Sequence, residues 1–253
     1  WIAFLRNGIG AALVMAVFLL LDCPRFSMKK TILYYAVGGV FFNIIFSVWY
    51  LGNAENFVQF SGLAVLLCLG TFCALMSSEG IYLALYKICF GFYLLSLVVF
   101  IGVDTARLWF DGNMGVDILI RFLLTAFVLI GVKRKLRVVL RENVDYLREE
   151  MDLFSAVTLV GSSLLAASSA YWPSFHIFSV ENIVRMFMIM LMAGIIQYLI
   201  LYLYIHLGKE HSYEKENQLL EMNEQFLRRQ LELEEEAQEE AARLRHDIRH
   251  HCR

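Results

Sequence analysis

The residues best suited to chemistry stand near the end of the chain, where three histidines accompany an acidic residue. The segment 244–251 reads Leu-Arg-His-Asp-Ile-Arg-His-His. On a helix with about 100° per residue, Leu244 and Ile248 lie on one apolar face, and His246 lies about 180° from that face. The neighbouring Asp247 is able to orient the imidazole or accept its proton, which raises the nucleophilicity of the ring. The pattern predicts an exposed histidine nucleophile on a packed helix.

A metal site is the alternative interpretation of these histidines. His246 and His250 are four residues apart, a spacing that lets two imidazoles share one helix face and bind zinc. On the same helix His251 points about 100° away from His250, and no acidic third ligand is well placed. The sequence therefore predicts no metal site.

A long charged helix precedes the histidines. Residues 208–253 hold 20 of the 46 charged residues, contain no proline and have their last glycine at 208. One heptad position carries Tyr213, Leu220, Leu227, Glu234, Ala241 and Ile248. The acidic run 232–236 interrupts this apolar seam, which then resumes, as in a coiled-coil stutter. The pattern favours a parallel coiled coil over 208–240, and the alternative is a solvated helix without a partner.

The first 207 residues are strongly apolar and predict a membrane domain. The whole chain is 59% hydrophobic and only 18% charged, whereas a soluble domain has about a quarter of its residues charged. A helix needs about 20 apolar residues to cross the bilayer. Seven stretches meet this need: 2–21, 31–51, 61–76, 81–103, 116–132, 153–172 and 183–207. The predicted fold is all-α, with a seven-helix transmembrane bundle followed by the cytoplasmic coiled coil.

Basic residues predict the orientation of this bundle. Ten of them fall in connections on one side if there are seven spans: Arg25, Lys29, Lys30, Lys87, Lys133, Arg134, Lys135, Arg137, Arg141 and Arg148. Two to four fall on the other side. Because cytoplasmic loops carry the excess of Lys and Arg, we expect the N-terminus outside and the charged tail inside a multi-pass plasma-membrane protein.

Two features of the spans leave alternatives open. The segment 133–152 is either an amphipathic helix at the inner membrane surface or a cytoplasmic extension of the neighbouring spans. Charged residues deep inside the spans are nearly absent, which disfavours an ion or proton pathway. Lys87 is the main exception, and we expect it to snorkel to the inner face.

The outer connections are short and aromatic, and they are the candidate ligand site. The first contains Arg107, Trp109 and Phe110, and the second contains Trp172 and Phe175. Such residues either form an interfacial aromatic belt or line the rim of a pocket for an apolar or aromatic ligand.

The segment 245–251 resembles the phosphoacceptor box of Agr-type sensor histidine kinases, which combine a multi-span sensor with a GHKL-type ATPase domain. The resemblance also covers the order of bundle, coiled coil and box along the chain. It implies that His246 is the autophosphorylated histidine and Asp247 the assisting acid or base, and that 241–253 begins the dimerisation and phosphotransfer helix. Many members have Asn four residues after the histidine, where this chain has His250.

The resemblance further implies a homodimeric sensor that detects an extracellular peptide or other small ligand and passes a phosphoryl group to a response regulator. ATP and Mg²⁺ would bind a catalytic domain that follows the box, so we expect a chain truncated after the phosphoacceptor and inactive alone. No nucleic-acid partner is expected. The alternative is a seven-span receptor or transporter whose tail only dimerises.

Overall fold

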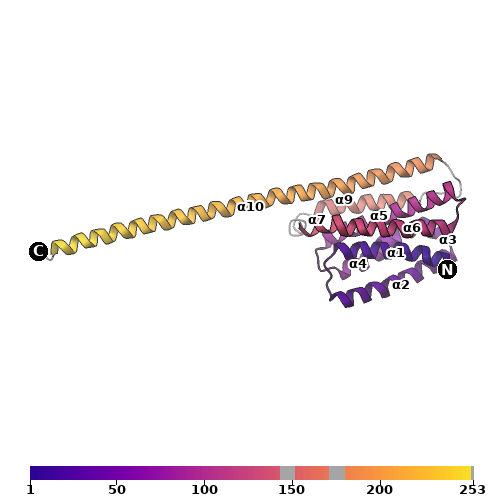
Figure 1. Cartoon of the computed structure of the whole chain (residues 1–253), viewed down its shortest axis with the longest axis horizontal. Helices are drawn as coiled ribbons and strands as arrows, with labels where there is room; N and C mark the ends of the chain where they lie inside the picture. Colours follow the sequence, from indigo (N-terminus) through magenta and orange to yellow (C-terminus); the bar gives the residue numbers. More distant parts are fainter. Residues whose placement is uncertain (143–151, 171–179, 252–253) are drawn as a thin grey trace. The chain divides into compact units, whose positions relative to one another are not determined.

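The computed structural model describes residues 1–142, 152–170 and 180–251, and within these ranges the chain is helical (Figure 1). The elements in order are α1 (Ile2–Leu21), α2 (Met28–Gly52), α3 (Ala54–Ala64), η1 (Val65–Leu69), α4 (Gly70–Met76), α5 (Ile81–Trp109), α6 (Met114–Gly131), η2 (Val132–Leu136), α7 (Arg137–Glu142), α9 (Asp152–Ala170) and α10 (Val180–His251). In the described part, β pairing is limited to an isolated bridge between Pro24 and Ser77. The prediction of an all-α chain is confirmed.

Six helical stretches are long and apolar enough to cross a membrane. They are Ile2–Leu21, Met28–Gly52, Ala54–Met76, Ile81–Trp109, Met114–Leu140 and a part of Val180–Glu239. The predicted span 153–172 corresponds to α9, whose described apolar portion, Ser155–Ala166, is shorter. Many large apolar side chains on these helices are exposed, among them Val37, Phe41 and Phe127, as expected for surfaces that face lipid. The chain is a membrane protein with about six candidate spans, and the count of seven stays a prediction.

Local sequence explains several helix ends. α1 ends before Pro24, which has no backbone N–H to continue the helix. The side chains of Asn53 and Asn113 accept hydrogen bonds from backbone N–H groups in the first turns of α3 and α6. Between α5 and α6 the chain turns through Asp111 and Gly112, whose φ values of 50° and 75° are left-handed.

Two π-helical turns interrupt otherwise α-helical spans. η1 lies between α3 and α4, and η2 joins α6 to α7. Such bulges are frequent at functional sites, and η1 supplies part of the cavity described below. Through η2 and α7 the helix continues to Glu142, so the first half of the segment 133–152 extends the preceding span. Residues 143–151 lie outside the described residues.

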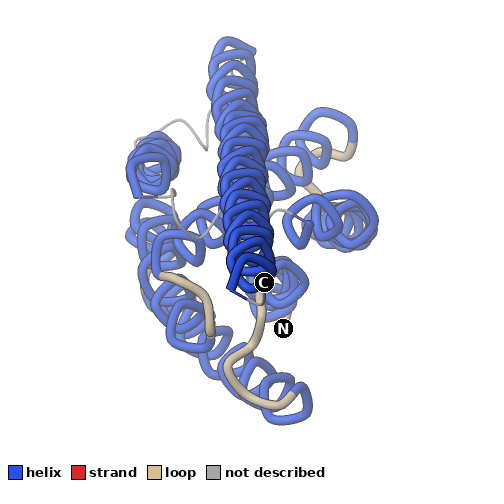
Figure 2. Tube along the Cα trace, turned by 90° about the vertical axis from the view of Figure 1, so that its left-hand side faces the viewer, coloured by secondary structure: helices blue, strands red, loops and turns tan. Residues whose placement is uncertain are grey.

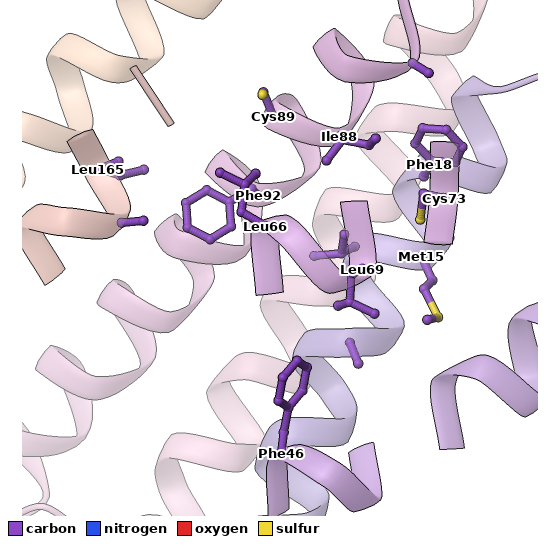
Figure 3. Close-up of a cluster of buried hydrophobic side chains, with 14 of the residues drawn as sticks. Met15, Phe18, Phe46, Leu66, Leu69, Cys73, Ile88, Cys89, Phe92 and Leu165 are labelled. Atoms are coloured by element: carbon purple, nitrogen blue, oxygen red, sulfur yellow. The ribbon is translucent and has the colours of Figure 1, made fainter. Parts of the chain in front are cut away.

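α1 and α5 form the centre of the apolar bundle. α1 packs against α2, α5 and α6, and α5 also packs against α6 and α9. Figure 2 views these helices end-on, with short loops joining their ends. One buried cluster includes Leu66, Phe92 and Leu165, which meet in Figure 3. A second cluster centres on Leu13, Val17 and other apolar residues of α1 and α5.

The chain divides into two compact units, Trp1–Ile205 and His206–Arg253. The described part of the second unit is helical and solvent-exposed. Its side chains form i,i+4 ion pairs such as Arg228 with Glu224, at 2.7 Å. Exposed pairs of this kind contribute only about 0.3–0.5 kcal/mol each, so they add little to the stability of the helix.

Candidate functional site

The helix that carries the histidine box is described, but the side chains of the box are not. Residues 244–251 lie at the end of α10. The orientation and surroundings of His246 and Asp247 fall outside the described residues, so their predicted roles stay predictions.

The predicted outer aromatic residues lie at the end of α5. Trp109 is the last residue of the helix and is 78% exposed, and Phe110 follows it, also exposed. Arg107 lies two residues before Trp109 and is half-buried. None of these three lines the cavity described next. Trp172 and Phe175 lie outside the described residues.

The first unit contains a partly open cavity of about 210 Å³ near the N-terminal end of α1. Its walls come from α1, α2, α3, η1, α5, α6, α9 and α10, and most of the lining side chains are apolar. Phe46, Phe57, Phe92, Phe100 and the two methionines Met186 and Met190 belong to this wall. Val65 and Leu69 of the π-helical turn η1 also line it. The cavity is therefore an apolar space that helices from the whole length of the unit build together.

One side of the cavity is charged. Asp117 and Arg121, four residues apart on α6, form a buried ion pair in which Arg121 Nε donates to Asp117 Oδ1 at 2.6 Å. Arg6 of α1 approaches the other carboxylate oxygen at 3.6 Å. Arg6, Arg121 and Asp104 line the cavity. Two guanidinium groups thus share the Asp117 carboxylate at the cavity wall.

Gly102 of α5 makes room for this ion pair. A Cβ atom at this position would lie 2.8 Å from Asp117 Oδ1 and 2.9 Å from Arg121 Cγ. Real Cβ atoms do not approach other atoms so closely, since carbon contacts have their optimum near 3.5–4.0 Å. The absence of a side chain at residue 102 is therefore a condition for the pair to form as it does.

Three residues that line the cavity each have a buried polar side-chain atom without a hydrogen-bond partner among the described residues. The atoms are Arg121 Nη2, Asn7 Nδ2 and Asp104 Oδ2. Buried polar atoms in proteins are nearly always paired, and leaving one unpaired costs about 1–3 kcal/mol. Their concentration around one cavity indicates that the cavity is a place where a further polar group can bind.

A second buried charged cluster, which we name the loop cluster, joins Asp22, Ser77, Glu79 and Lys87. Lys87 is 1% exposed and pairs with Glu79 and, at 3.5 Å, with Asp22. Ser77 donates a hydrogen bond to Asp22 at 2.7 Å. The expectation that Lys87 snorkels to the membrane surface is wrong, because Asp22 and Glu79 provide charged partners inside the protein.

The loop cluster ties two connections together. Ser78 donates to the carbonyl oxygen of Cys23 through its hydroxyl and its backbone N–H, at 2.7 and 3.2 Å. The backbone N–H of Arg25 donates to the carbonyl oxygen of Met76 at 3.1 Å. Burial raises the pKa of Asp22 from 3.8 to about 6, against the opposing effects of the Ser77 hydroxyl and the Lys87 ammonium. Hydrogen bonds and ion pairs of the loop cluster thus join the connection after α1 to the connection before α5.

Sequence reasoning missed the cavity, although part of its signal was visible. Asp117 and Arg121 have the i,i+4 spacing that places opposite charges side by side on a helix. Arg6 stands alone in the otherwise apolar run of the first span, where its partner is not evident from the sequence. No local pattern indicates that α1 and α6 bring these three residues together with Asp104.

Among the described residues no group of three or more His, Cys, Asp or Glu side chains is placed to hold a metal ion. The four described cysteines, Cys23, Cys68, Cys73 and Cys89, are free thiols. The cavity itself offers apolar contact, hydrogen bonds and charged groups to a ligand.

Comparison of the chain with protein-family models, with curated proteins and with solved structures finds no match.

Proposed function

We propose that this chain is the membrane-sensor part of a two-component histidine kinase. An extracellular peptide or other small ligand would bind the bundle and control autophosphorylation of His246 in the cytoplasm. The observation that carries the proposal is the phosphoacceptor-like box at 245–251, located on α10, the same helix that contains the last candidate span.

The positions of the buried charges support a receptor more than a transporter. The stretches between Arg6 and Asp22, between Lys87 and Asp104, and between Arg121 and Lys133 contain no Asp, Glu, Lys or Arg. An ion or proton pathway normally needs ionisable groups along its course. The cavity charges and the loop cluster lie near opposite ends of α1 and α5, and neither helix has an ionisable carboxylate or cationic group in between.

The proposed chemistry needs few residues of this chain. A neutral imidazole nitrogen of His246 attacks the γ-phosphorus of ATP, the bond to the β-phosphate oxygen breaks, and ADP leaves. Asp247 holds the ring and accepts or passes on its proton. By the resemblance, a GHKL-type domain binds ATP and Mg²⁺, and the phosphoryl group then passes to an aspartate of a response regulator.

A homodimer fits the surface of the second unit. Tyr213, Leu220, Leu227 and Leu231 are each about 60% exposed or more in the single chain. Burying such a seam in a parallel coiled coil stabilises the paired state by roughly 25 cal/mol per Å² of apolar surface. We infer that two copies associate through this seam.

Control by a ligand requires that the ligand bind one arrangement of the bundle more tightly than another. A ligand in the cavity would contact α10 directly, because Met186 and Met190 of this helix line the cavity. Its binding would therefore favour one position of α10 over another. A shift or rotation of α10 would then change how His246 is presented to the catalytic domain.

The test is phosphorylation of the chain joined to a GHKL-type catalytic domain and reconstituted in lipid nanodiscs. We expect labelled γ-phosphate from ATP to appear as an acid-labile, base-stable phosphoramidate. His246→Gln should abolish the label, whereas the matched control His250→Gln should retain it. Undiminished label in His246→Gln would contradict the kinase assignment and leave the receptor or transporter with a dimerising tail.

A further inference from the structure

The cavity beside the Asp117–Arg121 pair has the size of a single apolar group. Its volume is about 210 Å³, somewhat more than the 150 Å³ of an engineered cavity that takes up benzene. Pockets for drug-sized molecules are larger, at about 300–1,000 Å³. The aromatic and thioether side chains of the wall provide the apolar contact that one ring or branched aliphatic group needs.

The polar atoms of the wall define what the rest of the occupant must offer. Arg121 Nη2 and Asn7 Nδ2 are donors without a partner, so they need an acceptor oxygen. Asp104 Oδ2 is an acceptor without a partner, so it needs an N–H or O–H donor. Arg121 is 5% exposed, and bulk water therefore does not readily solvate its guanidinium.

A carboxylate ligand would satisfy the free donors but not the free acceptor. The charged groups around the cavity are Arg6, Arg107, Arg121, Asp104 and Asp117, and Arg107 interacts with both carboxylates. A carboxylate has no N–H or O–H to donate to Asp104 Oδ2, so it would leave that buried acceptor unpaired. A neutral group that has both a carbonyl oxygen and an N–H satisfies the free donors and the free acceptor together.

We propose that this cavity binds an aromatic or branched aliphatic group joined to an amide, with the amide carbonyl on Arg121 and Asn7 and the amide N–H on Asp104. The proposal rests on the sensing role proposed above and identifies the chemistry that the bundle recognises. Two sources share this chemistry: a free small amide, and an apolar side chain of a longer peptide together with its adjoining peptide bond.

The experiment measures binding to the chain itself in nanodiscs, by ligand-observed NMR with empty nanodiscs as the reference. Three probes have equal numbers of non-hydrogen atoms: phenylacetamide, phenylacetate and isobutylbenzene. We expect phenylacetamide to bind at least about tenfold more tightly than either of the other two, since a hydrogen bond to a charged group contributes about 1.5–3 kcal/mol. Equal binding of isobutylbenzene, or tighter binding of phenylacetate, would overturn the proposal.

Variants of residues in the cavity wall test whether phenylacetamide binds there. Asn7→Leu removes one free donor, and Arg121→Lys keeps the charge beside Asp117 but removes the second guanidinium nitrogen. Each should weaken phenylacetamide binding by about fivefold or more, and Val99→Phe, which fills the cavity, should abolish it. Leu119→Ala, at an exposed position of α6, is the matched control and should bind as the unaltered chain does. Unchanged binding in both Asn7→Leu and Val99→Phe would place the probe elsewhere and refute the site.

Two further arms separate the possible sources and the two proposals. N-acetyl-phenylalanine N-methylamide presents the same groups as a residue within a peptide. If it binds more tightly than phenylacetamide, the occupant is a peptide side chain with its amide, and if it binds more weakly, the occupant is a free amide. His246→Gln should leave binding of every probe unchanged, so failure of the kinase proposal and failure of the cavity proposal give different results.

Discussion

Gly102→Ala is the sharpest test of the buried ion pair, because it adds one carbon atom at a crowded place. The new methyl carbon would lie 2.8 Å from Asp117 Oδ1 and 2.9 Å from Arg121 Cγ. Restoring ordinary contact distances requires a displacement of about 1 Å. A displacement of this size is enough to stretch the 2.6 Å hydrogen bond between Arg121 Nε and Asp117 beyond hydrogen-bonding distance.

The expected cost follows from two known effects. Overpacking a well-packed interior costs about 1–3 kcal/mol, and full loss of one partner of a buried ion pair costs about 3–5 kcal/mol. The pair in Gly102→Ala is displaced and not removed, and alanine is the better helix former by about 1 kcal/mol. We therefore expect a loss of about 2 kcal/mol, or roughly thirtyfold in the unfolding equilibrium constant.

The assay is reversible unfolding in mixed detergent micelles, with Gly131→Ala as the matched control. Gly131 is also helical, but a Cβ atom there meets nothing within 4 Å. The control should be as stable as the unaltered chain or more stable. If Gly102→Ala and Gly131→Ala change stability equally, the ion pair does not depend on the absence of a side chain at residue 102. The packing described for Asp117 and Arg121 against α5 would then be wrong.

Two predictions concern the loop cluster. Lys87→Met should destabilise the chain by about 3–5 kcal/mol in the same unfolding assay, because it leaves buried carboxylates without their cation; a loss below about 1 kcal/mol would mean that Lys87 is not a structural partner. Because burial raises the pKa of Asp22 to about 6, the folded chain binds a proton at Asp22 more tightly than the unfolded chain does. This contribution to stability is present below about pH 4 and is lost as the pH rises through about 6. Asp22→Asn should therefore be more stable than the unaltered chain at pH 7 and equally stable at pH 4, and an advantage that is the same at both pH values would contradict the assignment.

The sequence was sufficient to predict the apolar helices that a lipid bilayer requires. The first span was predicted as 2–21 and α1 runs over Ile2–Leu21, although Arg6 and Asn7 interrupt its apolar run. A helix of about 20 apolar residues is the simplest way to satisfy backbone hydrogen bonds in lipid, so length and composition locate it. The π-helical turn η1 was not predicted, because its residues Val65–Leu69 are ordinary apolar residues.

The sequence pattern did not predict which side chains pair between different helices. Arg6 and Asp117 are far apart in the sequence, and the packing of α1 with α6 brings them together. The expectation for Lys87 failed because the hydrophobic pattern describes one helix against lipid, whereas Asp22 and Glu79 belong to connections outside that helix. The same limit explains why the cavity was missed, since its wall is assembled from many separate elements.

The proposed sensing mechanism has one consequence that can be measured without kinase activity. If a ligand in the cavity changes the state of the α10 dimer, then the state of the dimer must change the affinity for the ligand by the same factor. Leu227→Lys places a charge in the exposed apolar seam and should abolish dimerisation measured by chemical cross-linking. Gln225→Lys adds the same charge outside the seam and should dimerise normally.

Linkage then predicts the binding result. Coupling free energies between sites are typically about 1–3 kcal/mol, so phenylacetamide affinity in Leu227→Lys should differ from that of the unaltered chain by about fivefold or more. Gln225→Lys should match the unaltered chain. If Leu227→Lys is monomeric and still binds phenylacetamide with unaltered affinity, occupancy of the cavity has no thermodynamic connection to the coiled coil. A ligand there would then be unable to control His246 through dimerisation, however tightly it bound, because only differential affinity for two states shifts the balance between them.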